Sequence, residues 1–272
     1  MLKITIGQYY PVQSPIHRLD ARMKLLCTII FITVLFFIGN FLGYAFAAVF
    51  LAGMIKLSKV PPKYLIRGLR AIIFIIFFTA FLNIFFTAGG DVIFSWGPIQ
   101  ITQQGLVNAL RMAVRLVMLI IGSSMLTLTT TPIQLTEAIE FGLSPFKKIG
   151  VPAHEIAMML TIALRFIPTL MEEMDKIMKA QMARGADFDT GGLFKKAKSL
   201  VPLLVPLFIS SFRRADELAL AMEARCYRGD VGRTRMKQMK MRFSDYQALA
   251  VMGLFFATIL GIERLAGLWG VW

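Results

Sequence analysis

Long apolar stretches separated by short basic ones dominate the first half of the chain. The first of these stretches, Leu25 to Ile55, contains no charged residue. A straight helix over it would be about 46 Å long, which exceeds the ~30 Å hydrocarbon core of a bilayer, whereas two complete spans need about 40 residues. Gly39, Asn40 and Gly43 lie in its middle. We therefore predict a helical hairpin of two short membrane spans, broken near Asn40.

Three further apolar stretches predict three more spans, at Ala71 to Ala88, Leu106 to Thr131 and Phe243 to Ile262. The segment Val92 to Ile101 lacks Lys and Arg, and we expect a short loop or hairpin there, outside the cell. Basic residues collect instead in a predicted loop around Pro61-Pro62, and cytoplasmic loops carry such an excess. These basic residues are Lys56, Lys59, Lys63, Arg67 and Arg70. The pattern places the N-terminus in the cytoplasm and the C-terminus outside.

The region from Thr131 to Arg242 has a different pattern and predicts cytoplasmic helices. Thr131 followed by Pro132 is typical of a capped helix start, so a short helix is expected there. Two long helices follow, each apolar at first and amphipathic later. Their apolar faces carry a recurring series of long side chains. These are Met171, Met174, Met178 and Met182 in the first helix, and Leu218 and Met222 in the second.

These elements define the expected fold class, an all-α polytopic membrane protein. It comprises about five transmembrane helices plus a cytoplasmic coupling domain of one short and two long helices. The expected boundaries are 1–131 for the first four spans, 132–242 for the coupling helices and 243–272 for the last span.

Composition supports the membrane assignment. The 272 residues are 57% hydrophobic and only 17% charged, whereas soluble domains are roughly half apolar and about a quarter charged. The net charge of +14 is interpreted as cytoplasmic flank charge near anionic lipid, because no nucleic-acid-binding module is recognisable. Two distant cysteines, Cys27 and Cys226, predict neither a disulfide framework nor a metal site.

Both long helices lead to nearly the same ending, Ala183-Arg184-Gly185 in the first and Ala224-Arg225-Cys226 in the second. An Arg in the last turn followed by a small residue is ordinary helix punctuation, since cations favour the negative end of the helix dipole. The repetition favours a second interpretation, in which the endings dock onto a partner.

Enzyme motifs are incomplete in this chain. No phosphate-binding loop of the P-loop type is present, and His154-Glu155 lacks the second His of a zinc-protease helix. Asp187 and Asp189 form an isolated acidic pair, which leaves open a Mg²⁺-dependent membrane enzyme acting on lipid or isoprenoid phosphates. A self-contained carrier would normally need a carboxylate deep within its spans, and the interiors of the predicted spans contain none.

The sequence resembles the transmembrane T component of energy-coupling factor (ECF) transporters, the EcfT/CbiQ family, over essentially its whole length. The two Ala-Arg endings in tandem are the specific signal. The other matching features are Leu164-Arg165-Phe166-Ile167-Pro168 and Ser14-x-Ile16-His17-x-Leu19-Asp20-x-Arg22-x-Lys24.

This resemblance implies a non-catalytic subunit of an ABC-type importer in the bacterial cell membrane. Its partners would be two ATPases, which bind the ATP and Mg²⁺, and one substrate-binding S component that captures a vitamin or related micronutrient. No cofactor, metal or nucleic acid is expected on this chain. The resemblance assigns ATPase binding to Ala183, Arg184, Gly185, Ala224, Arg225 and Cys226. Cys226 departs from the commoner glycine and suits a left-handed backbone less well.

Two further sets of residues follow from this picture. Prolines within the long helices weaken the helical ladder and are candidate hinges, and three other residues of the matching motifs are assigned structural roles. These are Pro168, Pro202 and Pro206, with Arg165, Asp20 and Arg22. The apolar faces form either an S-component platform or a packing surface between the two helices. The candidate contacts are Met171, Met174, Met178, Leu218 and Met222. The sequence leaves open the transported solute, whether the chain serves one or several S components, and the roles of Arg111 and Arg115.

Overall fold

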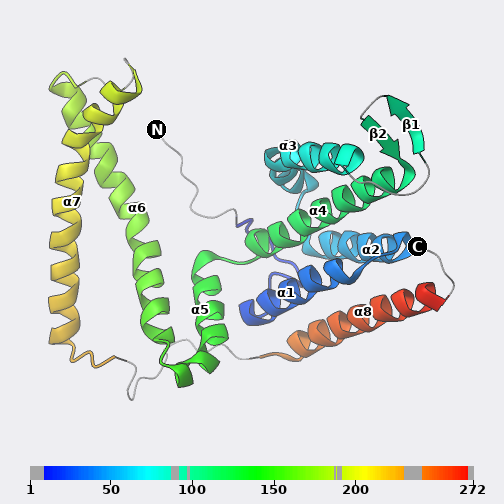
Figure 1. Ribbon diagram of the computed structural model, residues 1–272. Coiled ribbons are helices and arrows are strands. Elements are labelled where there is room, and N and C mark those ends of the chain that lie inside the picture. Colours follow the sequence, from blue (N-terminus) through cyan, green and yellow to red (C-terminus); the bar gives the residue numbers. More distant parts are fainter. Residues whose placement is uncertain are drawn as a thin grey trace. The chain divides into compact units, whose positions relative to one another are not determined.

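The computed structural model describes residues 9–86, 92–96, 99–186, 188, 192–229 and 241–268. Apart from one short hairpin, the regular secondary structure of these residues is helical, which confirms the all-α class (Figure 1). The helices are α1 (Ala21–Phe37), α2 (Phe41–Ser58), α3 (Pro62–Phe86), α4 (Gln103–Thr129), α5 (Pro132–Leu143), the 3-10 helix η1 (Ser144–Ile149), α6 (Ala153–Ala183), α7 (Leu193–Ala224) and α8 (Phe243–Leu268). The strands β1 (Val92–Trp96) and β2 (Ile99–Thr102) pair antiparallel. The chain forms two compact units, Met1–Ala138 with Gln238–Trp272, and Ile139–Lys237.

Four described helices are long and apolar enough to cross a membrane, namely α2, α4, α6 and α8. The segments Pro62–Arg70 and Ile72–Phe86 of α3 meet at 57° and make a fifth span if they are counted as one. The number of candidate spans agrees with the sequence prediction, but the helices that qualify are partly different ones. The 17 residues of α1 fall at the lower limit for a span, since about 20 are usual, whereas α6 qualifies by length and composition. Which helices lie in the membrane therefore stays a prediction.

The predicted helical hairpin is confirmed, with α1 ending at Phe37 and α2 beginning at Phe41. Side chains from two distant helices bind the exposed backbone groups at this break. Glu263 of α8 accepts hydrogen bonds from the backbone N–H groups of Gly39 (3.0 Å) and Asn40 (3.2 Å) and from the Asn40 amide (3.1 Å). Helix starts carry unsatisfied N–H groups and favour a carboxylate, so Glu263 stabilises the start of α2.

Arg115 of α4 binds the other side of the same break. Its guanidinium donates to the carbonyl of Ile38 (3.0 Å) and to the Tyr44 hydroxyl (3.0 Å), and that hydroxyl donates to the Ile38 carbonyl (3.1 Å). Arg111 lies over the ring of Phe41, 5.4 Å from its centroid. Both arginines therefore stabilise the α1–α2 turn, which answers the question that the sequence left open.

Replacing Glu263 by Ala is expected to lower the free energy of unfolding by about 1 to 3 kcal/mol, because it leaves the donors of Gly39 and Asn40 unpaired. Glu263→Gln keeps one acceptor oxygen in place and should lose about half as much. Thermal unfolding of the purified chain in detergent measures both, with the exposed Glu172→Ala as control. Equal melting temperatures for Glu263→Ala and Glu172→Ala would contradict this role.

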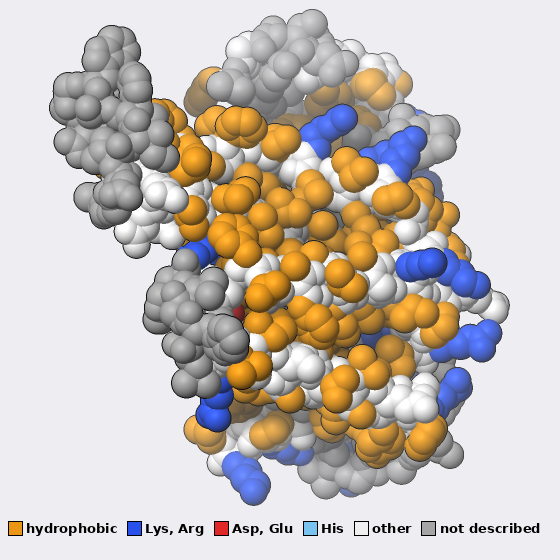
Figure 2. Space-filling model, turned by 90° about the vertical axis from the view of Figure 1, so that its right-hand side faces the viewer, with side chains coloured by type: hydrophobic (Ala, Val, Ile, Leu, Met, Phe, Trp, Pro, Cys, Tyr) orange, Lys and Arg blue, Asp and Glu red, His pale blue; other side chains and the backbone are white. Residues whose placement is uncertain are grey.

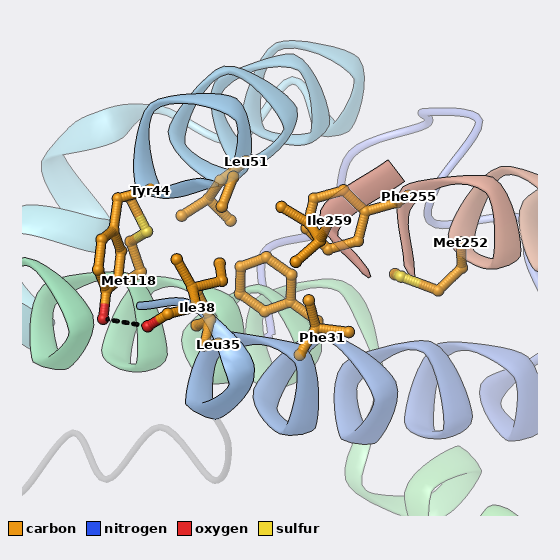
Figure 3. Packing of buried hydrophobic residues seen from close by; sticks show 11 residues of the cluster. Phe31, Leu35, Ile38, Tyr44, Leu51, Met118, Met252, Phe255 and Ile259 are labelled. Atoms are coloured by element: carbon orange, nitrogen blue, oxygen red, sulfur yellow. Dashed lines mark hydrogen bonds between the residues drawn. The ribbon is translucent and has the colours of Figure 1, made fainter. Parts of the chain in front are cut away.

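The main hydrophobic core lies where α1, α2, α4 and α8 meet (Figure 3). Its aromatic centre is Phe255 of α8, which stacks against Phe31 of α1 and Phe50 of α2. Gly122 of α4 allows the close approach of α1, since a Cβ there would lie 2.6 Å from the Phe31 ring. These four helices thus form one packed bundle.

The segment before α1 is fixed by hydrogen bonds. Asp20 is the N-cap of α1, and its carboxylate accepts from the N–H of Arg22 (3.0 Å), which agrees with the structural role assigned to it. His17 contacts the Ser14 hydroxyl (2.7 Å) and the Tyr10 carbonyl (3.0 Å), so its role is structural and based on hydrogen bonds. Burial lowers the pKa of the His17 imidazole, which favours the neutral ring with one donor and one acceptor nitrogen. Lys24 is buried and donates to the carbonyls of His17 (3.1 Å) and Thr129 (2.9 Å).

Two other expectations concern helix starts. The predicted basic loop is wrong for all but Lys59, because Lys56 lies within α2, and Lys63, Arg67 and Arg70 lie within α3, which begins at Pro62. Proline is favoured at the first helical position, so the Pro61-Pro62 pair starts a helix here rather than extending a loop. The predicted cap of α5 is confirmed, since Thr131 and Gln134 exchange hydrogen bonds in a capping box.

Candidate functional site

The two long helices of the second unit, α6 and α7, lie side by side and antiparallel (Figure 1). Glu173 in the second half of α6 binds residues of the second half of α7. It pairs with Arg214 (3.3 Å) and accepts a hydrogen bond from the Ser210 hydroxyl. Near the end of α6, the Gln181 amide donates to the carbonyl of Pro202 in the first half of α7 (3.4 Å). These contacts fix the direction of one helix against the other.

The α6 tip (Ala183, Arg184 and Gly185) ends its helix in a Schellman motif. The N–H of Gly185 donates to the Met182 carbonyl (3.0 Å), and the N–H of Ala186 donates to the Gln181 carbonyl (2.9 Å). Gly185 has the left-handed backbone that this motif requires, with φ of 87°. Arg184 is the C-cap residue.

The α7 tip (Ala224, Arg225 and Cys226) repeats this geometry residue by residue. The N–H of Cys226 donates to the Glu223 carbonyl (2.8 Å), and the N–H of Tyr227 donates to the Met222 carbonyl (3.0 Å). Cys226 takes the left-handed position with φ of 55°, which costs an L-residue about 1 kcal/mol. The repeated sequence therefore encodes a repeated structure, and the cysteine holds it under strain.

Backbone N–H groups form the caps at both tips, so the caps do not require the arginine side chains. Arg184 and Arg225 are both exposed, and neither guanidinium forms a hydrogen bond or salt bridge with the part of the chain that the structure describes. Capping thus accounts for Gly185 and Cys226. It leaves the two arginines available for a partner.

The antiparallel arrangement separates the two tips. The α6 tip lies near the first half of α7, where Gln181 reaches Pro202. From Pro202 the helix continues to Arg225, a rise of roughly 35 Å at about 1.5 Å per residue. The tips therefore lie at opposite ends of the helix pair and form two separate exposed cations.

Cys226→Gly is expected to stabilise the α7 tip by about 1 kcal/mol, because glycine adopts a positive φ without a steric cost. The matched change at the other tip, Gly185→Ala, should destabilise by a similar amount. The melting temperature of the full-length chain measures both. Opposite signs at the two tips are expected, and a loss of stability in Cys226→Gly would show that the cysteine side chain has a role of its own.

The remaining predicted site residues lie along the same helices. Pro168 is inside α6, and Pro202 and Pro206 are inside α7; both helices continue through them. Arg165 is exposed on α6. The predicted S-component contacts are all half-buried, and these are Met171, Met174, Met178, Leu218 and Met222.

The large exposed apolar side chains of this unit lie elsewhere, mainly in the first half of α7. They form what we call the α7 apolar face, which comprises Leu200, Val201, Leu204, Val205, Phe208, Ile209 and Phe212. Sequence reasoning missed this face as a contact surface, although its run of apolar residues without charge was visible. A contiguous apolar surface on a helix indicates a partner or lipid.

Two candidate acidic residues, Asp187 and Asp189, lie outside the described residues. Among the described ones, no group of three His, Cys, Asp or Glu side chains is arranged to hold a metal ion. The cysteine thiols at positions 27 and 226 are free.

Comparison with known proteins places these features in a wider group. Residues 12–238 match the CbiQ family model, described as cobalt transport protein. A protein of Thermosediminibacter oceani is 59% identical over 254 residues, covering 93% of this chain and 96% of its own. A protein of Clostridium kluyveri is 55% identical over 267 residues, covering 98% of this chain and 97% of its own. Both are named energy-coupling factor transporter transmembrane protein EcfT. The matched region includes α6, α7 and both tips.

Proposed function

The chain belongs to the CbiQ family and is the transmembrane component of an energy-coupling factor transporter, and from this premise we propose that it couples two ATPase subunits to a substrate-binding membrane subunit. ATP-driven movement of the ATPases would pass through α6 and α7 to that subunit. The substrate would be a vitamin or a related micronutrient. ATP and Mg²⁺ bind to the ATPases in this scheme, and this chain contributes no catalytic group.

One observation carries the proposal: two tips with the same Schellman geometry present two free arginines at opposite ends of one helix pair. A single partner site would need one such tip. Two tips separated by roughly 35 Å suit two partners of the same kind. Each ATPase would then hold one end of the pair, so that closure of the ATPase dimer moves the ends relative to each other.

The chemistry of arginine supports docking at the tips. Its guanidinium offers five donors in a planar fork, which match a carboxylate or the free carbonyls at a helix end of the ATPase. The small neighbours of each arginine, Ala183 with Gly185 and Ala224 with Cys226, let a partner surface approach closely. Removing one partner from a buried charged contact costs about 2 to 5 kcal/mol, which is enough to hold a subunit in place.

The α7 apolar face is the surface that we assign to the substrate-binding subunit. Its exposed leucine, valine, isoleucine and phenylalanine side chains would be unfavourable in water without a partner. The half-buried methionines of α6 and α7 add side chains that adapt to different partners. Pro168, Pro202 and Pro206 interrupt the hydrogen-bond ladders of α6 and α7 and are the proposed hinges.

The test is purification of the tagged full-length chain from its native membrane. Two ATPase subunits and one small membrane subunit should be recovered with it, and the reconstituted assembly should take up substrate into liposomes only with ATP. Uptake by the chain alone would contradict the proposal and favour a carrier. Turnover of a lipid phosphate by the chain with Mg²⁺, lost in Asp187→Asn, would favour the enzyme alternative.

A further inference from the structure

A basic pocket and an apolar pocket adjoin each other at one end of the first unit. The basic pocket has a volume of about 480 Å³ and is lined by Gln13, Ser14, Pro15, Arg18, Lys59, Arg242 and Ser244. The apolar pocket, of about 350 Å³, extends between α1, α2, α4 and α8. Pro15 and Ser244 line both, so the two pockets lie next to each other at these residues. The tips of α6 and α7 lie in the other unit.

Three cations and no carboxylate line the basic pocket. Arg18 donates to the Gln13 amide oxygen (3.3 Å), which orients it without neutralising its charge. Within the described part of the chain, the side chains of Lys59 and Arg242 form neither a hydrogen bond nor a salt bridge. Asp20, the carboxylate nearest to Arg18 in the sequence, does not line the pocket, and it accepts the N–H of Arg22. Asp245, the nearest to Arg242, is fully buried, and both of its oxygens accept backbone N–H groups. The pocket therefore carries an uncompensated positive charge.

The apolar pocket runs inward along the helices from this charged end. Along α8 it is lined from Ser244 to Met252, about 12 Å at 1.5 Å per residue. The opposite wall comes from α1, where Cys27 and Phe31 line it, and from Phe50 of α2. Apart from Lys24 and a few hydroxyl or amide groups near its mouth, its lining is hydrocarbon and sulfur.

The order of these two pockets matches one class of ligand. The basic pocket lies where α1 and α8 begin and α2 ends, and the apolar pocket continues along the helix axes. A membrane lipid has the same order, with its charged headgroup at the helix ends and its acyl chains parallel to the helices. A soluble phosphate would use the basic pocket alone, and a water-soluble apolar ligand would use the other alone.

We propose that these pockets together bind an anionic phospholipid, with the headgroup phosphate at Arg18, Lys59 and Arg242 and one acyl chain between α1, α2 and α8. Figure 2 shows one face of the molecule, on which most side chains are hydrophobic. A lipid bound in the two pockets joins the segment before α1 to the turn after α2 and to the start of α8.

The test uses the full-length chain in detergent and native mass spectrometry with two lipids of identical acyl chains, phosphatidylglycerol and phosphatidylcholine. The chain should bind phosphatidylglycerol more tightly. Arg18→Gln with Lys59→Asn and Arg242→Gln should weaken phosphatidylglycerol binding about 100-fold, because each of the three basic residues contributes about fivefold at an anionic headgroup. Asparagine is chosen at position 59 because that residue has a left-handed backbone, with φ of 57°.

A matched triple variant removes the same charge elsewhere, with Lys63, Arg67 and Arg70 of α3 each replaced by Gln. It should bind phosphatidylglycerol as the unaltered chain does. Ala248→Phe narrows the apolar pocket and should weaken the binding of both lipids. The melting temperature of each variant shows that it is folded.

Three results would overturn the proposal. An equal loss of phosphatidylglycerol affinity in the two triple variants would mean that only the net charge of the chain matters. Competition by glycerophosphate at the lipid's own concentration would show a phosphate site that does not need an acyl chain. Absence of phosphatidylglycerol from the intact transporter, purified from a membrane that contains it, would show that a protein partner covers the pockets.

Discussion

The double variant Arg184→Ala with Arg225→Ala is expected to lose both ATPase subunits during purification and to lose ATP-dependent uptake. Each arginine lies at the C-cap position of a tip, exposed and without a bond to the described part of its own chain. Truncating one side of a docked charged contact costs about 2 to 5 kcal/mol, which weakens binding about 30-fold or more.

The single variants make this prediction specific to two docking points. Because the tips lie at opposite ends of the helix pair, each change should weaken one ATPase contact and leave the other. The complex would then be held by one contact, and the loss in the double variant should exceed that in either single one. Arg184→Lys should recover little of the ATPase binding that Arg184→Ala loses, because an ammonium group lacks the planar fork of donors.

Quantitative recovery of ATPase subunits and uptake into liposomes measure these effects. Arg213→Ala is the matched control, since Arg213 is exposed on α7 but away from its tip. Normal recovery and uptake in the double variant would mean that the arginines serve only the helix ends. Their contribution would then appear only as a lower melting temperature.

The elements of this fold follow from local patterns, and those are the parts that the sequence predicts well. The break at Asn40 follows from a charge-free stretch too long for one span and too short for two. The start of α5 follows from Thr131-Pro132-x-Gln134, whose cap involves residues three apart. Neither inference needs information from another part of the chain.

The contacts that hold these elements together are not local, and the sequence does not predict them. Glu263 lies one residue beyond the last span expected from hydropathy, so the sequence pattern predicts only a charge flanking the membrane. Its partners, Gly39 and Asn40, lie at the far end of the chain. Likewise, Arg115 reads as a costly charge in a span until the Ile38 carbonyl is found beside it.

The candidate site likewise has a part that the sequence predicts and a part that it does not. The sequence predicts both tips, since the motif is contiguous, but their separation depends on the direction of α7 against α6. That direction is visible only in pairs such as Glu173 with Arg214. The apolar stripes were ambiguous for a related reason, because periodicity shows that a face is apolar and not what covers it.

Asp245→Ala is expected to produce the largest loss of stability among the single changes considered, about 2 to 4 kcal/mol. Only 1% of Asp245 is exposed, and its carboxylate accepts from the N–H groups of Asp20 (2.9 Å) and Arg242 (2.7 Å). Hydrogen bonds to charged groups contribute about 1.5 to 3 kcal/mol each, and water cannot replace the acceptor at a buried site. Glu263 is less buried, so its removal should cost less.

The intermediate variant Asp245→Asn separates the two hydrogen bonds. Its amide oxygen can accept from one N–H group, while the amide nitrogen faces the other donor. Asp245→Asn should therefore lose about half as much stability as Asp245→Ala. Thermal unfolding of the full-length chain in detergent measures the series, with the exposed Asp216→Ala of α7 as control. If Asp245→Ala and the control have the same melting temperature, the N–H groups of Asp20 and Arg242 find other acceptors. The two helices would then be held together by the packing of their side chains, such as that of Phe31 against Phe255.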